Sequence, residues 1–215
     1  MNRVITDGSS IYTDEAKAVM KNSLLGVFFY LIAFASGAFL ISSVVGSGQS
    51  YQWIAYGAAF ILILMLNKFK YSWVGFGMAL TMSGLLGYSV SGTLIYGMNT
   101  NPNLIGSVFL MAVLMVGSLM LYASQTKRRF NKFYGAAIWG VWSIIILSLV
   151  NVFLLGYPWL SMGISYAVLM LFTYITMSET QMILEGHEKS WIAGSVGIFL
   201  SLINKLLSLL NIFDE

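Results

Sequence analysis

Seven stretches of mostly apolar residues run along the chain, separated by short polar segments. Each is close to, or longer than, the roughly 20 residues that an α-helix needs to cross the hydrocarbon core of a bilayer. The pattern predicts an all-α integral membrane protein whose seven transmembrane helices form a bundle. The predicted spans cover residues 23–45, 51–67, 72–97, 103–123, 134–156, 159–182 and 190–213.

The last stretch, Ser190 to Phe213, carries small and polar residues at alternating steps of three and four. This spacing places them on one side of a helix. Lipid disfavours such a stripe, whereas neighbouring helices can approach it closely and hydrogen-bond across it. We therefore expect the seventh helix to be central in the bundle. The stripe consists of Gly194, Gly197, Ser201, Asn204, Ser208 and Asn211.

The third stretch has a similar face. Ser83, Gly87 and Ser91 are spaced four apart, and Gly84 lies beside them. We interpret these residues, with Gly194, Gly197 and Ser208, as helix-packing positions. A helix that lines a water-filled path would have the same composition, so that alternative stays open.

The composition narrows the class of protein. Hydrophobic residues make up 58% of the 215 residues and charged residues only 9%, against about 25% charged in soluble domains. With no cysteine and one histidine, we expect no disulfide, no metal site and no cofactor. The sequence contains no motif of an enzyme active site, so we expect a protein that is not an enzyme. Membrane lipid is the expected surrounding. The net charge of +3 does not indicate nucleic-acid binding, because the basic residues lie in short loops.

Lysine and arginine occupy every second loop. They precede the first span and fall between spans two and three, four and five, and six and seven, whereas 46–50, 99–103 and 156–158 contain none. The positive-inside rule then predicts a cytoplasmic N-terminus and a C-terminus outside. Residues 1–22 would form a cytosolic tail ahead of a transmembrane domain over 23–215. That tail either extends the first helix into the cytosol or is a flexible start.

Two charged residues, Glu179 and Lys205, fall inside predicted spans. Ionisable groups are costly in a bilayer and usually face the bundle interior or a wet cavity, so both are candidate pore or gate residues. The competing interpretations are that Lys205 extends to the outer headgroups and that Glu179 lies in cytosolic water. Ser201 and Asn204 are further pore candidates, but helix-packing hydrogen bonds are the favoured explanation for both.

The last two predicted helices also carry an ordered set of short motifs, and the third span contains Gly84-Leu85-Leu86-Gly87-Tyr88. Together they resemble the Bax-inhibitor (transmembrane Bax inhibitor motif) family, and above all its bacterial YccA-like branch. The motifs of the last two helices are Glu179-Thr180, Gly186 with Glu188, Trp191-Ile192, Ser201-Leu202-x-Asn204 and Ser208-Leu209-Leu210.

The resemblance implies two functions. Many family members are described as pH-sensitive Ca²⁺ or cation leaks whose pore is closed by two aspartates that share a proton. Those positions fall on Glu179 and Ser201 here, and a serine cannot ionise, so the coupled pair of carboxylates is not present. The Glu-plus-Ser combination is similar to the YccA-like branch, whose members are regarded as substrates and modulators of the membrane-anchored AAA protease FtsH.

We therefore expect a bacterial inner-membrane protein that binds an FtsH-type protease through its transmembrane helices and its tail, residues 1–22. The alternative is a proton-regulated leak for Ca²⁺ or another cation, gated by Glu179. A scaffold without transport activity is the third possibility.

Overall fold

The computed structural model describes residues 12–46, 49–126 and 128–213. This part of the chain is helical apart from short connections and contains no strand, which confirms the all-α prediction. The α-helices are α1 Asp14–Ser36, α2 Ser42–Val45, α3 Gln49–Phe69, α4 Trp73–Ser89, α5 Ser91–Thr100, α6 Pro102–Gln125, α7 Tyr134–Val150, α8 Pro158–Leu184 and α9 Trp191–Phe213. Two π-helical turns, Gly37–Ile41 and Asn151–Leu155, and a 3₁₀ turn, Asn131–Phe133, complete them.

Six helical runs in the described residues are long and apolar enough to cross a membrane, and the bent pair α4 and α5 makes a seventh. The two helices of this pair meet at 52°. At the bend, the Ser89 hydroxyl donates to the Leu86 carbonyl over 2.7 Å. Such a local bond competes with the backbone ladder and often bends helices. The predicted third span is therefore a broken helix.

The first span begins earlier than the hydrophobic pattern predicts. Thr13 caps α1, because its hydroxyl accepts a hydrogen bond from the Ala16 amide at 3.2 Å, and Asp14 and Glu15 lie in the first turn. Both features favour a helix start at this point. The helix therefore extends through residues 14–22, one of the two alternatives for this segment. Residues 1–11 of the predicted tail lie outside the described residues.

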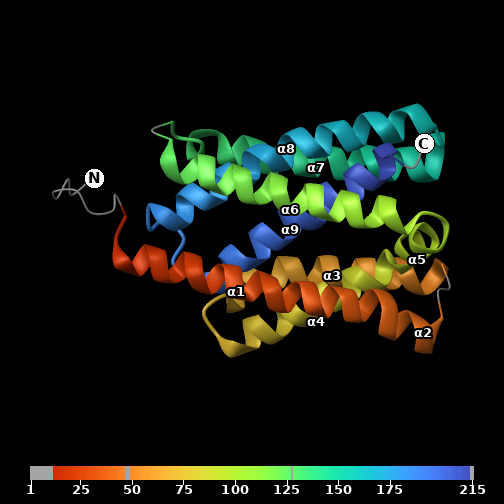
Figure 1. Cartoon of the computed structure of the whole chain (residues 1–215), viewed down its shortest axis with the longest axis horizontal. Coiled ribbons are helices and arrows are strands. Elements are labelled where there is room, and N and C mark those ends of the chain that lie inside the picture. Colours follow the sequence, from red (N-terminus) through yellow and green to blue (C-terminus); the bar gives the residue numbers. More distant parts are fainter. Residues whose placement is uncertain (1–11, 47–48, 127, 214–215) are drawn as a thin grey trace.

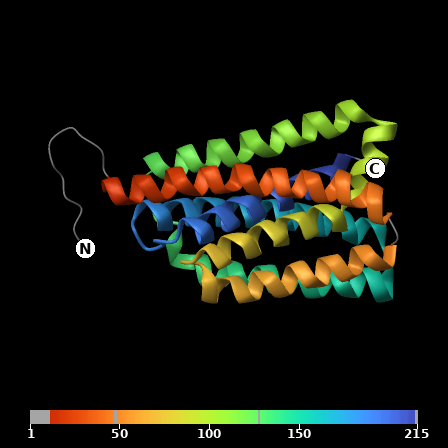
Figure 2. The same ribbon diagram turned by 90° about the horizontal axis from the view of Figure 1, so that it is seen from below.

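The helix α9 is central, as predicted. It runs between α1 and α4 on one side and α6 and α8 on the other, and it packs against all four (Figure 1). In its most apolar window 61% of the residues are buried, against at most 33% in the other five long runs. A view turned by 90° shows the remaining helices running roughly parallel around it (Figure 2).

The two ends of the bundle differ in charge. The chain enters at one end and α9 finishes at the other (Figure 1). We call the end where α1 begins the basic end, and the other the opposite end. With the exception of Lys205, the described lysines and arginines lie at the basic end: Lys17, Lys21, Lys68, Lys70, Arg128, Arg129, Lys132 and Lys189.

Glycines bring α1 and α4 into backbone contact. A Cβ atom on Gly87 would lie 1.9 Å from the Phe34 carbonyl oxygen, and one on Gly37 would lie 1.9 Å from the Gly84 carbonyl oxygen. Beside this contact Tyr30 and Phe34 stack edge-on against Phe199 of α9. The small residues of the third span thus pack against α1.

Candidate functional site

The structure brings Glu179 of α8 and Lys205 of α9 into the same interior region. The two helices run antiparallel and are in extensive contact. Glu179 lies near the basic end of α8, whereas Lys205 lies beyond the middle of α9. Opposite charges buried in one interface offset part of each other's desolvation cost.

The Glu179 carboxylate packs directly on the backbone of α9. A Cβ atom on Gly197 would lie only 2.5 Å from Oε1 of Glu179, so this glycine leaves the space that the carboxylate fills. Oε1 accepts a long hydrogen bond of 3.4 Å from the Tyr134 hydroxyl. Oε2 is buried and has no hydrogen-bond partner among the described residues. Glu179 is therefore an interior group, and the interpretation as a carboxylate in bulk water is wrong.

Lys205 is fully buried, with 0% of its surface exposed. Its ammonium donates to the Phe172 carbonyl oxygen over 2.9 Å and to the Thr176 hydroxyl over 2.6 Å, both on α8. The idea that Lys205 extends to the headgroups of the opposite end is wrong. Side chains on a helix lean toward its N-terminus, and α9 begins at the basic end, so Lys205 leans back into the bundle.

Ser201 lies between the two charges along α9, one turn from Gly197 and one turn from Lys205. It is fully buried, and its hydroxyl has no hydrogen-bond partner among the described residues. The carboxylate and the ammonium attract each other through space but form no ion pair within 4.0 Å in the described part of the chain. Glu179, Ser201, Lys205 and Thr176 form what we call the interior polar cluster.

A cavity lies between the helices next to Asn204. Two adjoining hollows, of about 540 and 230 Å³, lie between α3, α7, α8 and α9. Both are lined by Asn204, whose amide donates within α9 to the Leu200 carbonyl at 2.8 Å rather than to another helix. The larger hollow is also lined by Gln52 and Ser148. The smaller one is also lined by Phe172, the residue whose carbonyl binds Lys205.

The α6–α7 connection closes the basic end of the cluster. The Gln181 side chain donates to the Arg128 and Ala123 carbonyls at 2.6 and 3.3 Å and accepts from the Phe130 amide at 2.8 Å. Ser178 and Tyr174 donate to the Phe130 carbonyl. The sequence did not predict these hydrogen bonds between α8 and the α6–α7 connection, which we call the clamp. Three hydrogen-bonding side chains at positions 174, 178 and 181 nevertheless share one face of an apolar helix.

A second tie joins the α8–α9 loop to the turn between α3 and α4. Lys70 and Glu188 form a salt bridge of 2.9 Å. The Ser190 hydroxyl donates to the Lys70 carbonyl, and the Ser190 amide donates to Glu188 at 2.8 Å. These bonds fix the start of α9.

The predicted packing stripe of α9 faces its neighbours. A Cβ atom on Gly194 would lie 2.6 Å from the Ser23 hydroxyl of α1. The Asn211 amide donates to Ser161 and Ser165 of α8 at 3.3 and 2.9 Å, and Ser208 is buried. In the third span Ser83 and Ser91 are fully buried, and Ser91 accepts a bond of 3.2 Å from Gln52.

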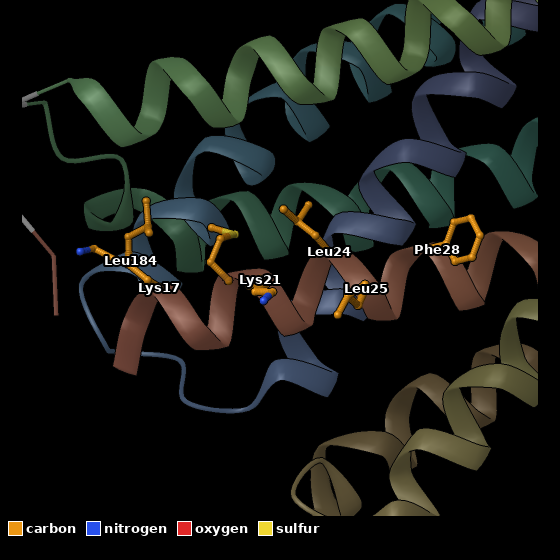
Figure 3. Close-up of a pocket in the computed structure, with 7 residues that line it drawn as sticks. Lys17, Lys21, Leu24, Leu25, Phe28 and Leu184 are labelled. Atoms are coloured by element: carbon orange, nitrogen blue, oxygen red, sulfur yellow. The ribbon is translucent and has the colours of Figure 1, made fainter. Parts of the chain in front are cut away.

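A groove of about 580 Å³ follows the basic-end half of α1 (Figure 3). Lys17 and Leu184 lie at one end of it, and Phe28 lies at the other. Its walls are apolar apart from two lysines, and its Phe28 side chain is 60% exposed. The complete lining is Lys17, Met20, Lys21, Leu24, Leu25, Phe28 and Leu184.

Hydrogen bonding and charge attraction are the interactions that the described side chains of this interior make. In the described part of the chain no three histidine, cysteine or carboxylate side chains come together as metal ligands. Two oxygens on α8, the Phe172 carbonyl and the Thr176 hydroxyl, already accept hydrogen bonds from the ammonium of Lys205.

Comparison with known proteins identifies relatives along nearly the whole chain. An uncharacterized protein of Campylobacter jejuni is 26% identical over 209 residues, which cover 94% of this chain and 87% of the relative. An uncharacterized membrane protein of Vibrio cholerae is 23% identical over 203 residues, which cover 93% of this chain and 90% of the relative. The sequence profile of the family described as inhibitor of apoptosis-promoting Bax1 matches residues 16–215. With this match and six or seven helical runs long and apolar enough to cross a membrane, the chain belongs to the Bax inhibitor family.

Proposed function

We propose that this membrane protein belongs to the YccA-like branch of its family, and that it binds and modulates a membrane-anchored AAA protease of the FtsH type. The observation that carries the proposal is the groove along the basic-end half of α1. The groove begins at Lys17, within the first turns of α1, and runs along the helix to Phe28.

The length of the first helical run supports this role. The run from Asp14 to Val45 has 32 residues, about 48 Å at 1.5 Å per residue, whereas the hydrocarbon core is about 30 Å thick. Its first turns therefore extend beyond the core at the basic end. The positive-inside rule places that end in the cytoplasm, where the ATPase and protease domains of an FtsH-type enzyme would be.

The side chains of the groove suit a transmembrane partner. Leu24, Leu25 and Phe28 are about half exposed, and they present apolar surface at membrane depth. Lys17 and Lys21 lie one to two turns nearer the basic end, level with the polar residues that would flank the partner's transmembrane segment. An amphipathic groove of this kind accommodates a helix whose apolar side chains fill it.

Affinity capture after in-membrane crosslinking tests the proposal. The full chain should recover an FtsH-type protease, and both Leu24→Trp in the groove and deletion of residues 2–11 should reduce the recovery. The deletion retains Tyr12, whose hydroxyl donates to the Ser124 carbonyl at 2.6 Å, and the Thr13 cap. Trp139→Ala, on the lipid-facing side of α7, is the matched control. Equal recovery from all four proteins would refute the proposal.

One observation favours the alternative function, a proton-regulated cation leak. The Glu179 carboxylate has a buried oxygen without a hydrogen-bond partner among the described residues, close to the clamp that closes the basic end. If Glu179 gates a leak, Glu179→Gln changes Ca²⁺ flux into liposomes and its dependence on pH. An unchanged flux profile would exclude Glu179 as a gate and leave the protease-binding function.

A further inference from the structure

We propose that Lys205 is a tethered cation: its ammonium group occupies a buried, oxygen-lined cation site at the centre of the bundle and keeps free inorganic cations out of it. This inference goes beyond protease binding and does not depend on it. It concerns the interior polar cluster, whereas protease binding concerns the surface of α1.

The groups around the ammonium are those that bind hard cations. The ammonium binds a backbone carbonyl of Phe172 and the hydroxyl of Thr176, and the carboxylate of Glu179 lies on the next turn of α8 without forming an ion pair with it. Carbonyl, hydroxyl and carboxylate oxygens are the usual ligands of sodium, potassium and calcium ions in proteins. Here the ligands hold a cation that is part of the chain.

The hydrogen bonds orient the ammonium toward these oxygens. The Thr176 hydroxyl donates to the Phe172 carbonyl at 2.6 Å, which directs its lone pairs toward Lys205. Phe172 thus accepts from both Thr176 and Lys205. Since the side chain is fully buried, bulk water is not there to solvate it, and these contacts replace its hydration shell.

The charge balance of the interior follows from this arrangement. Glu179 and Lys205 are the charged residues of the membrane-spanning interior in the described part of the chain, and they attract each other. From α7 the phenol of Tyr134, an uncharged group, faces the carboxylate. The interior therefore has no net negative charge to attract an added ion.

The cavity makes the exclusion relevant. Phe172 lines the hollow beside Asn204, and its carbonyl already accepts a hydrogen bond from the ammonium. At that point the fixed positive charge repels a second cation, and the repulsion is strong because the surroundings are buried.

Cation uptake into liposomes tests this inference with four proteins. Wild type should take up ⁴⁵Ca²⁺ and ²²Na⁺ no faster than protein-free liposomes. Lys205→Met should raise the rate at least about tenfold, since it removes the repulsion and leaves the carboxylate. The double variant Glu179→Gln/Lys205→Met should return to the wild-type rate. Lys189→Met, which removes an exposed lysine in the α8–α9 loop, is the control and should behave as wild type.

Two results would overturn the inference. One is wild-type uptake as fast as that of Lys205→Met, and the other is a folded Lys205→Met protein with no uptake above wild type. If Lys205→Met does not fold, thermal unfolding in detergent decides instead. Glu179→Gln leaves the ammonium without its counter-charge and should lower the Tm, and adding Lys205→Met to it should recover part of the loss. A double variant less stable than Glu179→Gln alone would then overturn the inference.

Discussion

At the scale of single residues, the polar side chains of α8 are stabilised by specific partners on other segments. Gln181 is the clearest case, because its amide is almost fully buried and makes three hydrogen bonds to the α6–α7 connection. Without these bonds, each buried donor or acceptor would keep its desolvation cost with no hydrogen bond to offset it. The residue therefore holds a basic loop against the end of the bundle.

Replacing Gln181 by alanine should release this loop. The carbonyls of Ala123 and Arg128 and the amide of Phe130 would lose their partner, at a cost of about 1–3 kcal/mol for the unpaired groups. Limited trypsin digestion of membranes, with cleavage scored after Arg128 and Arg129, should then proceed faster than in wild type. Gln125→Ala, at an exposed position on α6, should leave the rate unchanged. Identical digestion of both variants would show that Gln181 does not hold the loop.

At the scale of helices, α1 and α4 cross so closely that only glycine fits at the contact. A methyl group on Gly87 would collide with a backbone carbonyl, which cannot rotate away as a side chain could. Overpacking of this kind costs about 1–3 kcal/mol. Small residues here set the distance between the two helices.

Gly87→Ala should therefore destabilise the protein, and Gly77→Ala should not. Both glycines lie in α4, but a Cβ atom on Gly77 would meet nothing within 4 Å. We expect the free energy of unfolding in mixed micelles to fall by about 1–3 kcal/mol for Gly87→Ala. For Gly77→Ala it should stay the same or rise slightly, as alanine favours the helix. Equal losses for the two variants would contradict the packing account.

The sequence predicted these elements to different degrees. The spacing of small residues on α9 was enough to predict its central position, because lipid disfavours that stripe. Glu179 and Lys205 could be selected as interior candidates from their cost in a membrane. Their partners could not, because the Phe172 carbonyl and the Gly197 space depend on how α8 and α9 meet. The bend between α4 and α5 was also missed, since both halves are apolar and their pattern is continuous.

At the scale of the whole molecule, charge and hydrophobicity together define a polarised bundle. The seven crossings place α1's start and the basic loops at one end and the end of α9 at the other (Figure 1). From this polarity the positive-inside rule predicts an orientation with the basic end in the cytoplasm. The proposed binding of an FtsH-type protease depends on that orientation.

Single-cysteine labelling should establish the orientation, because the chain contains no cysteine of its own. A membrane-impermeant maleimide applied to intact spheroplasts should label Asn103→Cys at the opposite end. It should label Lys132→Cys at the basic end only after the membrane is opened. Labelling of Lys132→Cys in intact spheroplasts would reverse the orientation and place the groove of α1 out of reach of a cytoplasmic protease domain.

Site-specific photocrosslinking from the groove tests protease binding most directly. A photoreactive phenylalanine analogue would replace Leu25, which is 52% exposed in the groove region, or Trp139, which is 75% exposed on α7. The account predicts a crosslink to an FtsH-type protease subunit from position 25 and none from position 139. A crosslink of equal yield from both positions, or none from position 25 with the protease present in the membrane, would contradict it.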